Sequence, residues 1–464
     1  MIFIVRHNLS GIKIPLHFFN TISAQAQKYL LITPRSSARL GLPLHDQSYI
    51  ICLFHCHGHS LLLIHQIAHG GRMKGDETTE QVRDIMLDFA RLTGLAPAGV
   101  HPRRYLWTDA FAVCNYLGLY ETTCDDLYRD LALRLVDQVH HILGRHREDD
   151  PRKGWISGLD EESGELHPTR GGLRIGKQLN ERKPGESFDE RLEWDRDGQY
   201  YHYLTKWMHA LNRVSRVTGD PTYTGWGIDL AKTAQARFTY IPHPGGKKRM
   251  YWKMSIDLSH PLVPSMGQHD PLDGFVTYSE LQETAAAMNA GQSLMPDMSA
   301  EVAEMAEICR GRGLVTNDPL GIGGLLFDAS RMAQLIIMNG SNYGSPLENV
   351  VDSALVGMEA FVKGGSLLYP AGYRLAFREL GLSIGLSGIE KIFACIEENP
   401  RRFGNNSALE RGVKALAEYL PLGKDIERFW MEDNNRRAST WADHRDINMV
   451  MLATSLAPEG FLLI

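Results

Sequence analysis

From residue 73 onward, apolar residues recur at spacings of three and four, which is the period of an amphipathic helix. In the segment 77–93, Val82, Ile85, Met86 and Phe89 share one face and acidic residues occupy the first turn. The same pattern predicts about a dozen helices, near 77–93, 106–119, 126–144, 199–217, 221–237, 277–290, 298–312, 324–338, 346–363, 373–383, 387–398, 406–419 and 444–456. The chain is therefore expected to be all-α.

Strand-like alternation is scarce in this part of the chain. The best candidate is 249–255, RMYWKMS, for which we expect at most a short β-hairpin with 237–242. Two long stretches, 145–198 and 238–275, lack helical periodicity and are rich in Gly, Pro, Asp and Arg. Loops of this length in a compact domain usually carry function, so these stretches are expected to contribute to a site.

Two predicted helix pairs share a similar turn. The sequence TCDDLY at 123–128 aligns with TGDPTY at 218–223. A helix beginning with aromatic residues precedes each turn, and a second amphipathic helix follows it. The repeat favours a helical hairpin as the building unit, and a chance similarity between two turns is the alternative.

These features resemble the six-hairpin (α/α)6 toroid enzymes, which include glycoside hydrolases and the N-acylglucosamine 2-epimerase group. The resemblance rests on the turn T-G-D-x-x-Y, the helix start 106–111, LWTDAF, and the number of helices between 77 and 456. It covers most of the chain but is architectural, because no full catalytic motif of one family matches. It implies one toroid domain over 73–464, carbohydrate chemistry, and a site in the funnel where the inner helices begin.

The first 72 residues differ from the rest. They contain one acidic residue, Asp46, and eight of the nineteen histidines, without clean periodicity. We expect an atypical N-terminal extension that is disordered or that comes from an incorrect gene start, with Met73 as the true first residue. Histidines interrupt the apolar run 49–67, so we expect no membrane span. Zinc-ligand types occur there without a second pair at zinc-site spacing, so we expect no metal site and no cofactor: Cys52, Cys56, His57 and His59.

Composition narrows the class of partner. The 464 residues are 43% hydrophobic and carry a net charge of −6, so a basic surface for nucleic acid is not expected. The six cysteines are scattered rather than clustered as in a disulfide framework, which favours a reducing compartment such as the cytoplasm. We expect a small-molecule or oligosaccharide substrate and no membrane partner, and the oligomeric state stays open.

Acidic residues cluster just before the helix at 199–217. Glu193, Asp195 and Asp197 stand close together, and like charges raise at least one pKa, as a general acid requires. They could equally bind a cation or lie in solvent. Asp109 at another helix start is a further candidate, although it could simply complement the helix dipole.

Histidines form a second set of candidates. His202 lies near the start of the helix at 199–217 and is the one expected to reach a substrate. The loops or helix starts at 267–274 and 440–446 each place a histidine beside carboxylates, which gives the possible acid/base pairs His269–Asp270 and His444–Asp446. Hydrogen-bond networks within the loops are the alternative for both pairs.

The residues expected to bind substrate are aromatic, basic and acidic side chains near these candidates. Aromatic faces stack on pyranose rings, and arginines can clamp a carboxylate or phosphate. The glycine-rich loop at 167–177 fails the spacing of a P-loop, so ATP is not expected. The predicted binding residues are Arg104, Trp107, Arg170, Arg174, Trp194, Tyr201, Trp207, Trp441 and Asp446.

Three functions remain open. A glycoside hydrolase would use two of Asp109, Glu193, Asp195, Asp197 and Asp270, about 5 to 5.5 Å apart for retention or 6.5 to 9.5 Å for inversion. A sugar epimerase or isomerase would use His202 with His269 or His444 to move a proton beside a carbonyl. A noncatalytic carbohydrate-binding toroid would have an aromatic funnel with distant, exposed acids. The density of acids favours hydrolysis by a small margin.

Overall fold

The computed structural model describes residues 28–32, 48–56, 59–67, 74–99, 101–183, 185–288, 295–340, 343–404 and 406–464. The chain divides into two compact units, Met1–Glu77 and Thr78–Ile464, which are described separately. The first unit holds an antiparallel sheet of β1 (Lys28–Ile32), β2 (Ser48–Cys56) and β3 (His59–Ile67), in that order. The side chains of the zinc-ligand types named above lie outside the described part. The interpretation of residues 1–72 stays a prediction.

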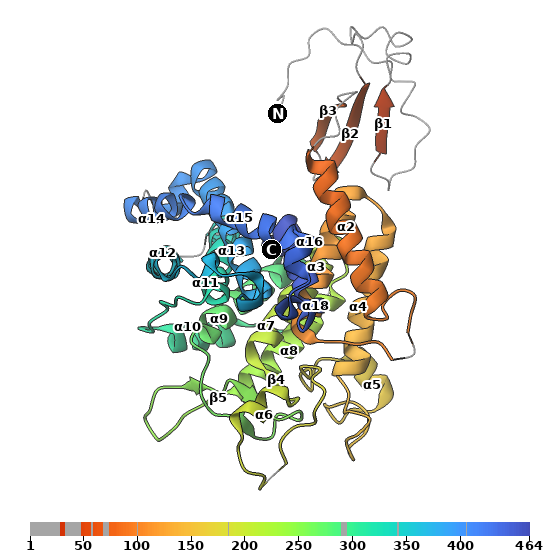
Figure 1. The fold of residues 1–464 in the computed structure, drawn as a ribbon, viewed down its shortest axis with the longest axis vertical. Helices are drawn as coiled ribbons and strands as arrows, with labels where there is room; N and C mark the ends of the chain where they lie inside the picture. The colour runs from red at the N-terminus through yellow and green to blue at the C-terminus, as the bar shows by residue number, and fades with distance from the viewer. Residues whose placement is uncertain are drawn as a thin grey trace. The chain divides into compact units, whose positions relative to one another are not determined.

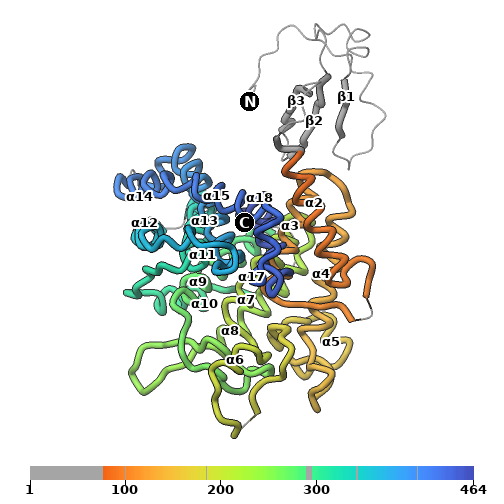
Figure 2. Tube along the Cα trace, in the orientation of Figure 1, coloured from red at the N-terminus to blue at the C-terminus, as the bar shows by residue number. Residues whose placement is uncertain are grey.

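Six helices of the second unit form a closed ring. Each packs on the next in sequence order, and the last packs on the first. Figures 1 and 2 show this closure, with the blue α18 beside the orange α3 although the two are far apart in sequence. The ring helices are α3 (Leu106–Thr123), α7 (Tyr201–Thr218), α9 (Asp270–Met288), α11 (Pro319–Asn339), α13 (Ala376–Glu398) and α18 (Arg445–Leu456).

Outer helices cover this ring. α4 (Asp126–Leu143) packs on α3, and α8 (Thr222–Phe238) packs on α7. In the same way α10 (Ser299–Cys309) lies on α9, α12 (Gly344–Gly364) on α11, and α14 (Ser407–Ala417) and α15 (Leu420–Met431) on α13. α2 (Lys74–Leu92) contacts α3, because the Tyr116 hydroxyl donates to the Met86 carbonyl. The architecture is the (α/α)6 toroid that the resemblance implied.

The ring is densely packed where α11 crosses α13. A Cβ atom on Gly323 would lie 2.1 Å from the carbonyl oxygen of Gly381, so the two backbones touch directly. Among the described residues, α11 is also the one helix long and apolar enough to cross a membrane. Its most apolar window is 72% buried within the protein, so other helices cover most of that surface.

The predicted elements and the observed ones differ in a few places. The expected hairpin is confirmed, because β5 (Thr239–Tyr240) pairs with β6 (Arg249–Met250). A second small sheet, which the pattern did not predict, joins the two long loops to the start of α7; its order is β4 (Gln199–Tyr200), β7 (Lys253–Met254), β8 (Pro261–Val263). The remaining short helices are α5 (Glu161–Leu166), α6 (Glu190–Asp195), η2 (Ser366–Leu368), η3 (Ala371–Tyr373), η4 (Pro400–Phe403), α16 (Asp433–Arg436), α17 (Ser439–Ala442) and α19 (Glu459–Leu462).

The C-terminal turn, α19, lies inside the ring. The Phe461 ring stacks on Phe111 at 4.1 Å and on Phe327 at 4.3 Å between centroids, so it sits between α3 and α11. Its carbonyl oxygen lies 2.8 Å from Nε2 of His209 on α7. The end of the chain therefore fills the middle of the toroid about two turns below the start of α7.

Candidate active site where the inner helices begin

The inner helices begin at one end of the toroid, because residues of their first turns contact one another or lie close. His202 of α7 lies near Asp270 of α9, with 3.9 Å between Nδ1 and Oδ1. Nη1 of Arg378 on α13 lies 2.6 Å from a carboxylate oxygen of Asp318, the N-cap of α11. The Phe377 ring packs edge-on against His444 at the start of α18. These first turns lie at the end of the toroid where the site was expected.

Aromatic rings surround His202. Tyr203 packs edge-on at 4.8 Å and Trp107 at 5.9 Å, while Trp252 lies nearly parallel at 6.1 Å between centroids. Trp252 comes from the loop between β6 and β7, and pairing of β7 with β4 brings this loop to the start of α7. Trp194 packs edge-on against Trp252 and is half exposed, so the wall of rings continues outward to solvent.

Three polar atoms in this wall are buried without a hydrogen-bond partner among the described residues: Trp107 Nε1, His202 Nδ1 and Asp270 Oδ2. Buried polar groups in folded proteins are nearly always hydrogen-bonded, so each such atom requires an explanation. Trp107 packs on His202, and His202 lies beside Asp270, so the three belong to one small region. A polar ligand that donates and accepts hydrogen bonds would satisfy all three.

The protonation of the pair follows from its surroundings. Burial, with a further contribution from the charge of Asp273, raises the pKa of Asp270 to about 7. Burial, followed by the charge of Lys206, lowers the pKa of His202 well below its usual value. Near pH 7 the site therefore holds a neutral imidazole beside a carboxyl group that is still partly protonated.

A buried ionic network lies beneath this pair. Lys206 of α7 and Arg331 of α11 both bind Asp273 of α9, at 2.7 and 3.0 Å. Arg331 also binds Glu280 at 2.9 Å, and Glu280 in turn binds His209 at 2.9 Å. The network joins three inner helices and fixes the negative charge of Asp273 one turn after Asp270.

The predicted acids of the 193–197 segment have other partners. Glu193 is buried and binds Lys253 at 2.9 Å and Arg182 at 3.2 Å. Asp197 is buried and binds Arg174 at 2.6 Å, while the N–H of Gly176 donates to it. These ion pairs hold the long 145–198 loop together.

Asp195 and Asp109 complete the set of predicted acids. Asp195 is exposed at the end of α6. Asp109 is buried at the start of α3, where it accepts from the N–H of Tyr105 at 2.8 Å and lies 3.4 Å from Arg104. Burial raises the pKa of Asp109 to about 6, although the charge of Arg104 opposes this. Asp109 lines a separate cavity, together with Asp446.

The predicted aromatic residues fall into two groups. Trp107 and Trp194 belong to the wall beside His202. Tyr201 and Trp207 are fully buried, and their polar atoms bond to Tyr278 and His140 respectively. Trp441 is also buried, stacked on Trp430. Tyr201, Trp207 and Trp441 therefore contribute to the packing of the toroid.

The remaining predicted residues have separate partners or are exposed. Nε2 of His269 lies 2.8 Å from the Leu314 carbonyl oxygen, and burial lowers the pKa of this histidine. His444 is exposed. Asp446 binds Arg103 at 3.0 Å, and exposed Arg170 pairs with Asp229.

Sequence reasoning missed Tyr203, Trp252 and Arg378. Trp252 lies within the segment 249–255 that was predicted as a strand. An aromatic residue at that position was the signal that could have indicated a binding residue. Tyr203 directly follows His202 in the sequence, and that position was the available signal. Nothing local distinguishes Arg378 from other arginines at helix starts.

No protein-family model matches the chain, and no curated protein matches its sequence. Among solved structures, the chain is similar to the cellobiose 2-epimerase of Spirochaeta thermophila, with 11% identity over 81% of this chain and 97% of that one and a TM-score of 0.40. It is also similar to a sugar epimerase from a ruminal bacterium, with 10% identity over 82% and 98% and a TM-score of 0.43. A family 76 glycoside hydrolase from a bovine Bacteroides thetaiotaomicron strain gives 9% identity over 90% and 85%, with a TM-score of 0.46.

Proposed function

We propose that this protein is a carbohydrate-active enzyme that moves a proton on its sugar substrate, as an epimerase or isomerase does. His202 and Asp270 would form the acid/base pair. The observation that carries the proposal is the geometry of the pair: Nδ1 of His202 lies 3.9 Å from Oδ1 of Asp270, and His202 Nδ1 and Asp270 Oδ2 are buried without a hydrogen-bond partner among the described residues. A carboxyl group with a pKa of about 7 can donate a proton, and the neutral imidazole has a nitrogen lone pair that can accept one.

The chemistry requires a sugar in its open-chain form. The His202 imidazole would remove the proton from the carbon beside the carbonyl, and Asp270 would donate a proton to the carbonyl oxygen to give an enediol. Return of that proton from the His202 imidazolium to the former carbonyl carbon, with release of the other hydroxyl proton to the Asp270 carboxylate, would complete an isomerisation without a net gain or loss of atoms. An epimerisation would instead return a proton to the first carbon on its opposite face. The aromatic wall around His202 supports a sugar ligand, because aromatic faces pack on the C–H faces of sugars.

Hydrolysis of a glycosidic bond is the second candidate, and the raised pKa of Asp270 favours it. A carboxyl group that stays protonated near pH 7 is suited to protonate a leaving oxygen. Hydrolysis also needs a second carboxylate at a defined separation. Glu193 and Asp197 are each engaged in two ion pairs, and Asp273 binds Lys206 and Arg331, which weighs against these three as that partner.

The noncatalytic binding toroid is the third candidate. It predicts funnel acids that are far apart and exposed to water. The burial of Asp270 beside His202 weighs against the binding toroid. A surface that only binds a sugar gains nothing from a carboxyl group whose pKa is raised to about 7.

Incubation of the protein with free sugars and oligosaccharides in heavy water tests the three candidates. Incorporation of deuterium into the sugar at the carbon beside the carbonyl, detected by NMR, would support proton transfer. New reducing ends without deuterium exchange would support hydrolysis, and the absence of both products would support the binding toroid.

Site variants test the assignment of the pair. We expect Asp270→Asn and His202→Gln to lose most of the activity. Asp195→Asn removes an exposed carboxylate of α6, and this variant should keep its activity. Loss of activity in the Asp195 variant with retention in the other two would overturn the assignment.

A further inference from the structure

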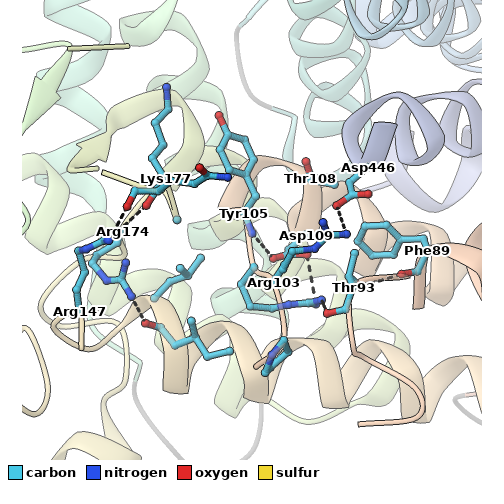
Figure 3. A pocket seen from close by; sticks show the side chains of 16 residues that line it. Phe89, Thr93, Arg103, Tyr105, Thr108, Asp109, Arg147, Arg174, Lys177 and Asp446 are labelled. Atoms are coloured by element: carbon cyan, nitrogen blue, oxygen red, sulfur yellow. Dashed lines mark hydrogen bonds and ion pairs between the residues drawn. The ribbon is translucent and has the colours of Figure 1, made fainter. Parts of the chain in front are cut away.

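A cavity of about 310 Å³ lies at the start of α3, where the loops at 145–178 meet the first turn of α18. Figure 3 shows arginine and lysine side chains along its walls. We name this cavity the basic pocket. The ionisable residues that line it are Arg103, Arg104, Arg147, Arg174 and Lys177, with Asp109 and Asp446.

The basic pocket has more positive than negative charge. Its lining carries five basic side chains and two carboxylates. Two more carboxylates lie against the basic groups: Asp197 binds Arg147 and Arg174, and Asp149 binds Arg147. Lys177 is the one basic residue of the lining that forms no ion pair with a carboxylate of the described residues. A bound anion would supply such a partner.

Arg104 provides the second observation. The residue is only 4% exposed, and its Nε atom is buried without a hydrogen-bond partner among the described residues. Its other contacts are with the Thr93 carbonyl at 2.9 Å and with Asp109 at 3.4 Å, the second of which is long for a charged hydrogen bond. A buried guanidinium N–H without an acceptor is costly, and an oxyanion in the cavity would supply that acceptor.

Lys177 lies at the rim of the basic pocket. Its ammonium group packs over the rings of Trp194 and Tyr200, and it also donates to the Trp194 carbonyl. Burial, with a further effect of the nearby Lys253 charge, lowers the pKa of Lys177 to about 8. The lysine is therefore charged at pH 7 and becomes neutral as the pH rises through 8.

We propose that the basic pocket binds a small oxyanion, the phosphate or carboxylate group of an anionic sugar or the free anion itself. Arg104 and Lys177 would donate to it, and Arg103 would contribute charge. Tyr105 lines this pocket, and its hydroxyl lies 2.8 Å from the hydroxyl of Tyr203, which packs on His202. The basic pocket and the His202 region thus share a wall. The link to a sugar rests on the proposed function, but oxyanion binding does not.

Calorimetric titration with sulfate at pH 7 tests the site directly. Sulfate is the probe because its charge does not change between pH 6 and 9. We expect saturable binding that Lys177→Met and Arg103→Gln each weaken by about tenfold, which is about 1.4 kcal/mol, because each variant removes a positive charge beside the anion. Arg91→Gln, which removes an exposed arginine paired with Asp88 outside the pocket, should bind as the parent does.

A variant with the opposite effect separates binding from a purely structural role. Asp446 holds Arg103 at 3.0 Å, so Asp446→Asn should free Arg103 and strengthen sulfate binding several-fold. Affinity should also fall between pH 7 and 9 in the parent and stay flat in Lys177→Met. Absence of saturable binding to the folded parent, or equal affinity in all variants, would overturn the proposal.

The source of the oxyanion is distinguished by competition. Displacement of sulfate by glucose 6-phosphate or glucuronate, at lower concentrations than inorganic phosphate or acetate requires, would indicate an anionic sugar. Equal potency of the free anions would indicate a free-anion site. Sulfate binding without turnover of any sugar would count against the proposed function alone, and turnover of neutral sugars without sulfate binding would count against the basic pocket alone.

Discussion

Asp270 begins α9 with its carboxyl group buried beside His202. The burial that suits this carboxyl group to donate a proton also lowers the stability of the protein. Replacement by asparagine should lower turnover by at least about 100-fold, because the proton donor is lost. The same change should raise stability above pH 7. A raised folded-state pKa means that the parent loses stability as pH rises from the unfolded value near 4 to about 7, and asparagine avoids that loss, which is on the order of a few kcal/mol. Activity and thermal unfolding at pH 6 and 8 check both effects.

The pH dependence of the reaction follows from the same pair. We expect kcat/KM to fall above about pH 7, because Asp270 then loses the proton that it donates. The neutral form of His202 should persist well below pH 6, since burial lowers its pKa, so no decline is expected between pH 7 and 5.5. A rate profile from pH 5 to 9 measures both limits. A rate that rises through pH 8 would exclude Asp270 as the acid.

At the level of single residues, the sequence could indicate candidate groups but not their partners. Glu193 and Asp197 are crowded along the chain, which favoured them as acids with raised pKa values. In the structure their charges are matched by Lys253, Arg182 and Arg174, which lie up to 60 residues away in sequence. Such matching depends on the folded loops, and no local pattern contains it.

At the level of elements, the contact between α11 and α13 depends on glycine. Gly323→Ala would place a Cβ atom 2.1 Å from the Gly381 carbonyl oxygen and should destabilise the protein by about 3 kcal/mol or more. Gly324→Ala, on the next residue of the same helix, meets no atom within 4 Å and should be neutral or stabilising by up to about 1 kcal/mol. Denaturant unfolding of the two variants measures the difference. Equal stabilities would contradict this account of the crossing.

Helical periodicity predicted most of the long helices and placed the starts of α3, α7 and α18 within two residues, but it misplaced the start of α9. The pattern placed the start of the third inner helix at 277, whereas α9 begins at Asp270. The intervening residues DPLDG contain Pro and Gly, which normally indicate a loop. In the structure Pro271 occupies the first turn, where it costs no hydrogen bond, and Gly274 leaves room for the Tyr201 hydroxyl. The proposed acid, Asp270, lies at this helix start, so the segment that the pattern misplaced is also the one that positions Asp270.

At the level of the whole molecule, the first inner helix, α3, must contact the last, α18, for the ring to close. Asn115 of α3 donates to the Val450 carbonyl at 3.1 Å, and the Thr454 hydroxyl donates to Asn115 at 2.9 Å. These bonds join helices separated by more than 300 residues. Because they form only when the complete ring is present, we expect the described toroid to unfold as one cooperative unit rather than hairpin by hairpin.

The C-terminal turn, α19, is part of that closure, and substitution of Phe461 tests how much it contributes to stability. Phe461 lies between Phe111 and Phe327, and its carbonyl contacts His209, so one residue touches three inner helices. Phe461→Ala should lower the free energy of unfolding by about 3 to 5 kcal/mol through loss of packing and creation of a cavity. Leu463→Ala, at a partly exposed position two residues on, should cost far less. If thermal unfolding showed equal losses, or none, the turn would not be a structural part of the ring, and the toroid would have to be stable around an unfilled centre.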